Sequence, residues 1–315
     1  MKKKWMSKIP NNKKLSLLNI PGTHDSTAYN ISCLGSCFAK TQDMDILTQL
    51  NIGVRLFDIR VTKNNSFFSN FSNSNNFNFM NSLICCHGIF NCYHSENNKN
   101  IYLTYEYVLR IIKNFLEENP SEIVIIKTDS GRGNKFSNIE NASEIFDTIL
   151  GNIAVKFNNN YTLGELRGKV VYMFSNKIEG GTDIIPIHEK YSNGNENFKE
   201  FKVDGELKVK EIKDLLQKYN YDFTEAEKNM VLPLNFETSC TGEFNKIIPL
   251  PRYEANIVNK FLKENYFKKG KYYGWISIDF IDEFIANKII ESNFYEDNNN
   301  YNNNEIIDII NEDSS

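Results

Sequence analysis

The spacing of apolar residues changes repeatedly along the chain, and each spacing predicts a different element. Short, nearly continuous apolar runs predict buried strands at residues 54–61, 82–86, 122–127, 169–174, 230–236 and 275–281. A further apolar run at residues 15–20 ends at a turn formed by Pro21 and Gly22. Apolar residues recur at helical spacing over residues 107–116, and further helices are expected at residues 139–150, 254–267 and 283–294.

Strands that alternate with helices predict a parallel sheet with both faces covered. Four reactive side chains lie at or just past the carboxyl ends of the predicted strands, where barrel enzymes carry their sites: His24, Arg60, His87 and Asp279. The pattern therefore predicts an α/β fold of the TIM-type (β/α) barrel class in a single domain. A doubly wound open sheet is the alternative, but the chain has no Gly-rich phosphate loop to support it.

Composition limits the classes of function. The 315 residues are 41% hydrophobic, which is typical of a globular domain. The formal net charge of −4 disfavours a nucleic-acid partner bound through bulk positive charge, and no segment approaches the ~18 apolar residues of a membrane span. We expect a catalytic domain at residues 1–295 and a flexible, Asn-rich acidic tail at residues 296–315.

The six cysteines are compatible with several states. Cys33 with Cys37, and Cys86 with Cys92, are close enough in sequence for small disulfide loops, although the sequence does not determine the pairing. A zinc site at residues 85–94 is conceivable, but its spacing matches no standard structural zinc pattern. We favour buried thiols with one or two loop disulfides.

Two of the four histidines lie in motifs suited to phosphate chemistry. They occur in residues 20–26 (IPGTHDS) and 85–88 (CCHG), with residues 54–60 (VRLFDIR) between them. Cleavage of a phosphodiester by an internal hydroxyl needs a base, an acid and positive charge at phosphorus, which His24, His87 and Arg60 can supply. His94 and His188 lack such neighbours, so we expect them to be structural.

The two histidine segments, together with residues 53–60 (GVRLFDIR), 115–122 (FLEENPSE) and 274–281 (GWISIDFI), resemble the bacterial phosphatidylinositol-specific phospholipases C. The resemblance runs in order from about residue 5 to residue 294. It implies a distorted TIM-type barrel. It also implies cleavage of phosphatidylinositol into diacylglycerol and inositol 1,2-cyclic phosphate.

The resemblance assigns a role to each matching residue. It implies that His24 is the general base paired with Asp279, and that His87 is the general acid paired with Asp25. Arg60 would bind the phosphate, and Asp58, on the same strand face, would support the site. Because Arg60 stands where eukaryotic relatives hold calcium, we expect no metal and no other cofactor.

The headgroup and membrane contacts follow the family pattern less closely. The family carries an arginine near residues 174–175 and an aspartate at the position of Lys199, and this chain carries neither. Lys177 and Phe201 are the candidates here for binding inositol. The rim residues expected to touch the membrane are Phe38, Phe244, Ile247 and Ile248. The expected partner is a membrane that contains phosphatidylinositol.

The resemblance implies a secreted or cell-surface monomer, although the basic start of the chain is not followed by the apolar run of a signal peptide. Two other functions remain open. One is a metal-dependent phosphodiesterase on the same barrel, such as a glycerophosphodiesterase or a sphingomyelinase D. A Glu-x-Asp motif at the second strand would indicate such an enzyme, and the sequence has Asp58-Ile59-Arg60 there. The other is a catalytically inactive lipid-binding module, which predicts the loss of a catalytic histidine.

Overall fold

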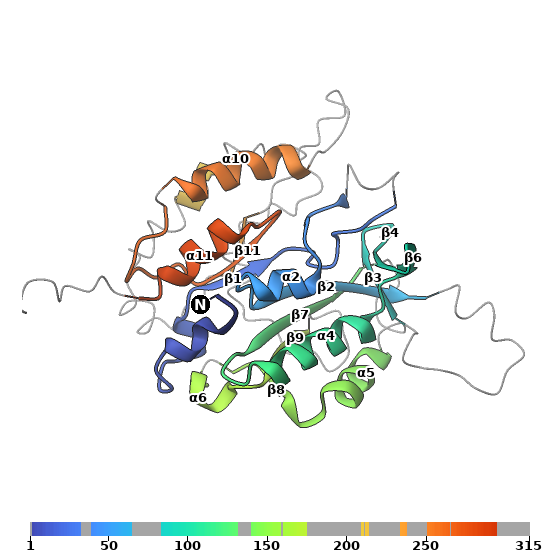
Figure 1. Cartoon of the computed structure of the whole chain (residues 1–315), viewed down its shortest axis with the longest axis horizontal. Coiled ribbons are helices and arrows are strands. Elements are labelled where there is room, and N and C mark those ends of the chain that lie inside the picture. The colour runs from blue at the N-terminus through green and yellow to red at the C-terminus, as the bar shows by residue number, and fades with distance from the viewer. Residues whose placement is uncertain are drawn as a thin grey trace, which may run out of the picture.

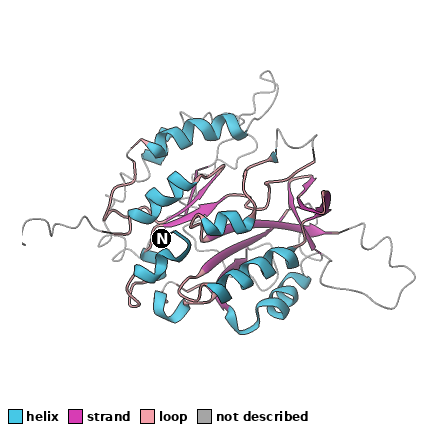
Figure 2. Ribbon diagram, viewed as in Figure 1, coloured by secondary structure: helices cyan, strands magenta, loops and turns pink. Residues whose placement is uncertain are grey.

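The computed structural model describes residues 2–32, 39–64, 83–131, 140–158, 160–174, 209–210, 212–213, 234–237, 251–264 and 266–294. Seven parallel strands form the centre, and helices flank them (Figures 1 and 2). The strands are β1 (Ile20–Thr23), β2 (Leu56–Lys63), β7 (Val124–Ser130), β8 (Ala154–Lys156), β9 (Val170–Phe174), β10 (Leu234–Glu237) and β11 (Trp275–Ile278). None of the helices in these residues combines the length and the hydropathy needed to cross a bilayer.

The order of strands in the sheet is β10-β11-β1-β2-β7-β9-β8. The last strand of the sequence thus pairs with the first, and every pair along this path is parallel. In a doubly wound sheet the final strand lies at an edge, whereas here β11 lies between β10 and β1. This adjacency favours a barrel over the open-sheet alternative.

Helices lie on both sides of the strands (Figure 1). They are α2 (Ile46–Asn51), α4 (Tyr105–Glu118), α5 (Glu140–Leu150), α6 (Leu163–Leu166), α10 (Pro251–Lys263) and α11 (Glu283–Glu291), with 3₁₀ segments at Lys2–Lys8, Leu15–Leu17 and Gly151–Ile153. In α4, the Thr104 side chain caps the helix by accepting from the Tyr107 amide. Of the apolar stripe predicted over residues 107–116, Val108, Ile112, Phe115 and Leu116 are buried, whereas Tyr107 is exposed. The predicted strands and long helices are confirmed to within a few residues. The sequence reading missed α2, α6 and β8.

The prediction of a Pro-Gly turn was wrong, because Pro21 and Gly22 lie inside β1. Pro21 has no N–H to donate, but its carbonyl accepts a hydrogen bond from the Arg55 amide at 2.9 Å, so β1 still bonds here to the segment that enters β2. A Cβ on Gly22 would lie 2.8 Å from Leu56 and 2.9 Å from the Ile276 carbonyl oxygen. The glycine therefore lets β2 and β11 pack tightly on both sides of β1.

A second correction concerns the strand that carries His87. β3 (Leu83–His87) pairs antiparallel with β2, and it continues into β4 (Phe90–Asn91) and a separate hairpin of β5 (Tyr93–Glu96) and β6 (Lys99–Tyr102). His87 thus does not follow a parallel barrel strand, as the alternation of elements suggested. An antiparallel strand brings its own carboxyl end to the site because the extended β2 continues beyond the parallel part of the sheet.

The opposite end of the strands is stabilised by a buried ion pair. Arg55 and Glu122 are both fully buried, and the guanidinium donates to Glu122 Oε2 at 2.9 and 3.1 Å. The remaining donors reach the carbonyls of Lys3, Leu50 and Val54, so the buried charge is well satisfied. Arg55 and Glu122 belong to the segments at residues 53–60 and 115–122 that resemble the phospholipase family. These segments therefore include residues that stabilise the fold as well as residues of the site.

The cysteines that the structure describes are thiols. Cys85, Cys86 and Cys92 are buried and form no disulfide with one another, so the suggested Cys86–Cys92 disulfide was wrong. The zinc alternative also fails for the described residues, whose only group of ligands close enough to hold a metal lies elsewhere. Cys33, Cys37 and Cys240 lie outside the described residues, as does the predicted tail.

Candidate active site

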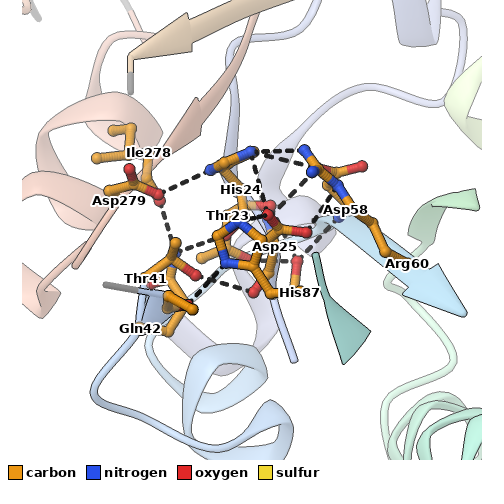
Figure 3. Close-up of polar contacts among 12 residues, drawn as sticks. Thr23, His24, Asp25, Thr41, Gln42, Asp58, Arg60, His87, Ile278 and Asp279 are labelled. Atoms are coloured by element: carbon orange, nitrogen blue, oxygen red, sulfur yellow. Dashed lines mark hydrogen bonds and ion pairs between the residues drawn. The ribbon is translucent and has the colours of Figure 1, made fainter. Parts of the chain in front are cut away.

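The predicted catalytic residues lie together at one end of the strands (Figure 3). His24 and Asp25 follow β1, Asp58 and Arg60 lie on β2, His87 ends β3, and Asp279 follows β11. Arg60 lies within its strand rather than at the end, because β2 extends to Lys63. The ring centroids of the two histidines are 6.2 Å apart, and their planes cross at 81°.

The ring nitrogens of His24 face groups of opposite kind. Nδ1 lies 2.9 Å from Asp279 Oδ1, which can only accept, so this nitrogen carries a proton. Nε2 lies 2.9 Å from an Arg60 guanidinium nitrogen, which can only donate, so in this contact Nε2 offers its lone pair. The Arg60 contact thus describes a neutral imidazole whose basic site is Nε2, the form that a general base requires, and Asp25 Oδ2, 3.4 Å from Nε2, can accept from the ring once it is protonated.

His24 is a stronger base than an ordinary histidine. Burial lowers its pKa, but the carboxylates of Asp25 and Asp279 together outweigh burial and raise the pKa to about 9. The Arg60 guanidinium acts in the opposite direction, since it competes with a proton for Nε2. The contact with Arg60 therefore belongs to the unprotonated state, which becomes populated as the pH approaches 9.

Both ring nitrogens of His87 face acceptors. Nδ1 donates to the Ala39 carbonyl oxygen at 2.7 Å, and Nε2 lies 3.1 Å from Asp25 Oδ2. A neutral ring has one N–H and can satisfy one of these acceptors, whereas an imidazolium satisfies both. Both ring nitrogens of His87 thus point at acceptors, and Nε2, beside Asp25, is the nitrogen placed to donate a proton as a general acid does.

Arg60 lies between the two histidines. Its Nε is 2.8 Å from Asp25 Oδ1, and a terminal nitrogen is 3.9 Å from Asp58 Oδ2. The Lys127 ammonium, on β7, lies 3.1 Å from Asp58 Oδ1. Burial raises the pKa of Asp58, but Lys127 and Arg60 outweigh it and hold this pKa far below its usual range. Asp58 is therefore a permanent anion that orients two cations at the site.

A metal ion is the other possible source of positive charge here. His24, Asp25 and Asp58 present ligand atoms within 4.8 Å of one another. The Arg60 guanidinium contacts all three side chains, and Lys127 contacts Asp58 as well. Because two cations already neutralise these carboxylates, the residues present fit a divalent cation poorly.

A buried polar network fixes the loop that carries His24 and Asp25. Asp25 adopts a left-handed conformation with φ of 41°, which is uncommon for a residue with a side chain. Gln42 Nε2 donates to the carbonyls of His24 and Ile278, and the Thr41 hydroxyl donates to the Asp25 carbonyl. Residues 41–42 thus hold the carboxyl ends of β1 and β11 together (Figure 3).

Sequence reasoning missed Lys127, Thr41 and Gln42. Lys127 had a signal, since it lies in the apolar run of β7 and a buried lysine needs a partner. Thr41 and Gln42 had none, because their role depends on contacts formed only after folding. His94 stacks on Tyr107 with ring centroids 4.2 Å apart, consistent with its predicted structural role. The residues predicted to bind inositol or touch the membrane lie outside the described residues: Lys177, Phe201, Phe38, Phe244, Ile247 and Ile248.

Comparison with known proteins supports the resemblance seen in the motifs. The chain is 28% identical to the 1-phosphatidylinositol phosphodiesterase of Staphylococcus aureus (strain Newman), over 92% of this chain and 93% of the relative. It is 33% identical to the enzyme of that name from Listeria monocytogenes over 128 residues, which cover 40% of this chain and 32% of the relative. No protein-family model matches the chain.

Two solved structures share the fold. A mutant of the phosphatidylinositol-specific phospholipase C from Staphylococcus aureus superposes with a TM-score of 0.65 at 22% identity, covering 93% of this chain and 98% of the other. The corresponding protein from Listeria monocytogenes gives a TM-score of 0.63 at 22% identity, covering 93% and 99%. The distorted TIM-type barrel and the resemblance to the bacterial phosphatidylinositol-specific phospholipases C are confirmed over nearly the whole chain.

Proposed function

We propose that this chain is a bacterial-type phosphatidylinositol phospholipase C, a phosphatidylinositol diacylglycerol-lyase. It cleaves the phosphodiester through attack by the 2-hydroxyl of inositol, and the products are diacylglycerol and inositol 1,2-cyclic phosphate. The observation that supports this most directly is the opposite setting of the two histidines. His24 presents a lone pair and His87 is held as a donor, with Arg60 between them.

In the first half of the reaction, His24 Nε2 removes the proton of the 2-hydroxyl while its oxygen forms a bond to phosphorus. The imidazolium that results is stabilised by the Asp279 carboxylate at 2.9 Å from Nδ1. As the bond from phosphorus to the glycerol oxygen breaks, the His87–Asp25 pair supplies a proton to that oxygen. Arg60 stabilises the charge that develops on the phosphoryl oxygens.

The same groups can open the cyclic product with exchanged roles. The His87–Asp25 pair, now without its proton, activates water, and the His24 imidazolium returns a proton to the 2-oxygen. Both histidines then regain their starting protonation states. We expect this second reaction to be slow, because water must reach a site arranged for a lipid leaving group.

Metal independence is part of the proposal. Arg60 and Lys127 supply the positive charge that a cation supplies in metal-dependent phosphodiesterases. The competing function, a metal-dependent phosphodiesterase on the same barrel, has one observation in its favour, the group formed by His24, Asp25 and Asp58. A test in the presence of EDTA separates the two.

The partner that fits this activity is a membrane surface containing phosphatidylinositol. One solved Staphylococcus aureus relative was studied for modulation of its membrane binding. In this chain, Ile89 is 79% exposed in the turn directly after His87 and Gly88, so an apolar side chain lies next to the acid. We propose a secreted or cell-surface monomer whose catalytic domain spans residues 1–295. In this proposal Lys177 and Phe201 bind the headgroup, and rim residues 38, 244, 247 and 248 touch the lipid.

Phosphorus NMR of phosphatidylinositol vesicles in EDTA tests the activity. The expected result is a cyclic phosphodiester signal that appears first, followed by slow formation of inositol phosphate. His24→Ala and His87→Ala should each lower turnover at least about 10³-fold, whereas His94→Ala, which alters a histidine stacked on Tyr107, should retain it. A strict requirement for calcium, or the absence of a cyclic product, would contradict the proposal.

A further inference from the structure

The short turn after β11 decides where the Asp279 carboxylate points. Phe280, the next residue, adopts a left-handed conformation with φ of 51°, so this turn departs from ordinary backbone geometry. On one side, the Phe280 amide donates to the Thr41 carbonyl at 2.6 Å. The Phe280 ring lies under the Arg252 guanidinium, whose central carbon is 3.9 Å from the ring centroid.

On the other side, one side chain from α10 holds the same turn. Asn259 Nδ2 donates to the Asp279 carbonyl at 3.0 Å and to the Phe280 carbonyl at 3.1 Å. Because both of these atoms are acceptors, the amide nitrogen must face them. Asn259 is 7% exposed, and its Oδ1 has no hydrogen-bond partner among the described residues. Burying an unpaired carbonyl lowers stability, so this asparagine has a cost that an apolar residue would avoid.

The side of the turn that faces α10 borders a cleft. This cleft of about 740 Å³ lies between α10 and the residues after β11, and it is lined by Asn256, Asn259, Lys263, Phe280 and Asp282 among others. An element that borders a cleft is free to move in that direction unless hydrogen bonds restrain it. The two bonds from Asn259 supply that restraint.

We infer that Asn259 is a positioning residue that keeps the Asp279 carboxylate directed at His24 Nδ1. It does not touch the proposed substrate, and it acts through the Asp279–Phe280 backbone. This inference rests on the proposed function. Misplacement of a catalytic group by about 1 Å through a remote substitution can cost a hundredfold in rate, so the restraint is large enough to matter.

The effect of losing Asn259 is specific because the other groups around His24 are held independently. Asp25 follows β1, Asp58 and Arg60 come from β2, His87 comes from β3, and Lys127 reaches Asp58 from β7. Among the described residues, four charged groups face His24: Asp25, Asp58, Arg60 and Asp279. Of these, only Asp279 comes from the α10 side of the site.

Asn259→Leu, which keeps the side-chain volume and removes both donors, tests the inference. The matched control is Asn256→Leu, on the exposed side of the same helix and lining the same cleft. In Asn259→Leu, kcat should fall about tenfold to a hundredfold with KM unchanged. The titration midpoint of the His24 imidazole, followed by NMR without substrate, should move to lower pH because Asp279 contributes less to raising it. Neither quantity should change in Asn256→Leu.

A lower kcat with an unchanged His24 midpoint would overturn the inference, since that pattern is expected of a merely structural residue. If Asn259→Leu does not fold, Asn259→Ser is judged by the same two measurements. In an Asp279→Asn background, the Asn259 substitution should have little further effect, whereas full additivity would also contradict the inference. The NMR midpoint does not depend on turnover, so a failure here is distinguishable from a wild-type protein that does not cleave phosphatidylinositol.

Discussion

The two histidines of the site differ in what faces their ring nitrogens and in how the chain delivers them. His24 follows a central parallel strand and lies between a donor, Arg60, and an acceptor, Asp279. His87 ends an antiparallel strand at the margin and lies between two acceptors, Ala39 and Asp25. The role of each histidine, base or acid, thus follows from its hydrogen-bond partners. Substitutions around the two rings can test whether these roles are opposite.

The largest expected effect is loss of either ring. His24→Ala and His87→Ala should each lower kcat about 10³- to 10⁴-fold on phosphatidylinositol, as measured by release of cyclic phosphate. A substrate whose leaving group is a phenolate needs no proton from an acid. On that substrate His87→Ala should recover most of its activity, while His24→Ala should not. Equal recovery of both variants would show that the roles are not opposite.

The next effect concerns the cation between the two rings. Arg60→Lys keeps the charge but removes the planar fork, and it also removes the donor that faces His24 Nε2. We expect kcat to fall about 10²- to 10³-fold in steady-state assays. If calcium or magnesium restored the variant to the wild-type rate, a metal would be able to do the work assigned here to the guanidinium.

Asp279→Asn should lower kcat by about 10²-fold and alter the pH profile. Because the Asp279 carboxylate is among the groups that raise the pKa of His24 to about 9, its loss should move the acid limb of kcat/KM to lower pH. The wild-type limb should lie near pH 9 rather than near 6.5, since the base works only after losing its proton. An acid limb near 6.5 in both proteins would contradict this assignment.

The smallest effect is on stability and concerns His24 alone. A pKa raised in the folded state contributes stability that is full below about 6.5 and is lost as the pH rises through 9. The maximum contribution is about 3 kcal/mol. Urea unfolding at pH 6 and at pH 9.5 should therefore show a fall in the free energy of unfolding that His24→Gln reduces. An identical fall in both proteins would assign it to other groups.

The local motifs made much of the site predictable. His24 and Asp25 are adjacent in sequence, and Asp58 and Arg60 share a strand face, so short segments carried the chemistry. The pairing of His24 with Asp279 came from the family resemblance, because the two residues are 255 positions apart. Asn259 carried no local signal, since an asparagine in an amphipathic helix usually faces solvent.

The fold was predictable where periodicity is strong and misread where special residues intervene. The helix at residues 105–118 and the strand at residues 124–130 follow from their apolar patterns. Pro21 and Gly22 gave a turn signal inside a strand, because the close approach of Leu56 and Ile276 requires glycine there. The direction of β3 was not readable from its composition, since buried strands look alike whichever way they run.

The adjacency of β1 and β11 also fixes when activity arises during synthesis. At ordinary translation rates, about 10 to 50 s separate the emergence of His24 from that of Asp279. After His87 has emerged, the growing chain has every other proposed catalytic residue but no partner for Nδ1 of the base, and β1 lacks β11, one of its two neighbours. A chain released before residue 279 therefore lacks both the β11 neighbour of β1 and the carboxylate that orients the base, so its activity should be low.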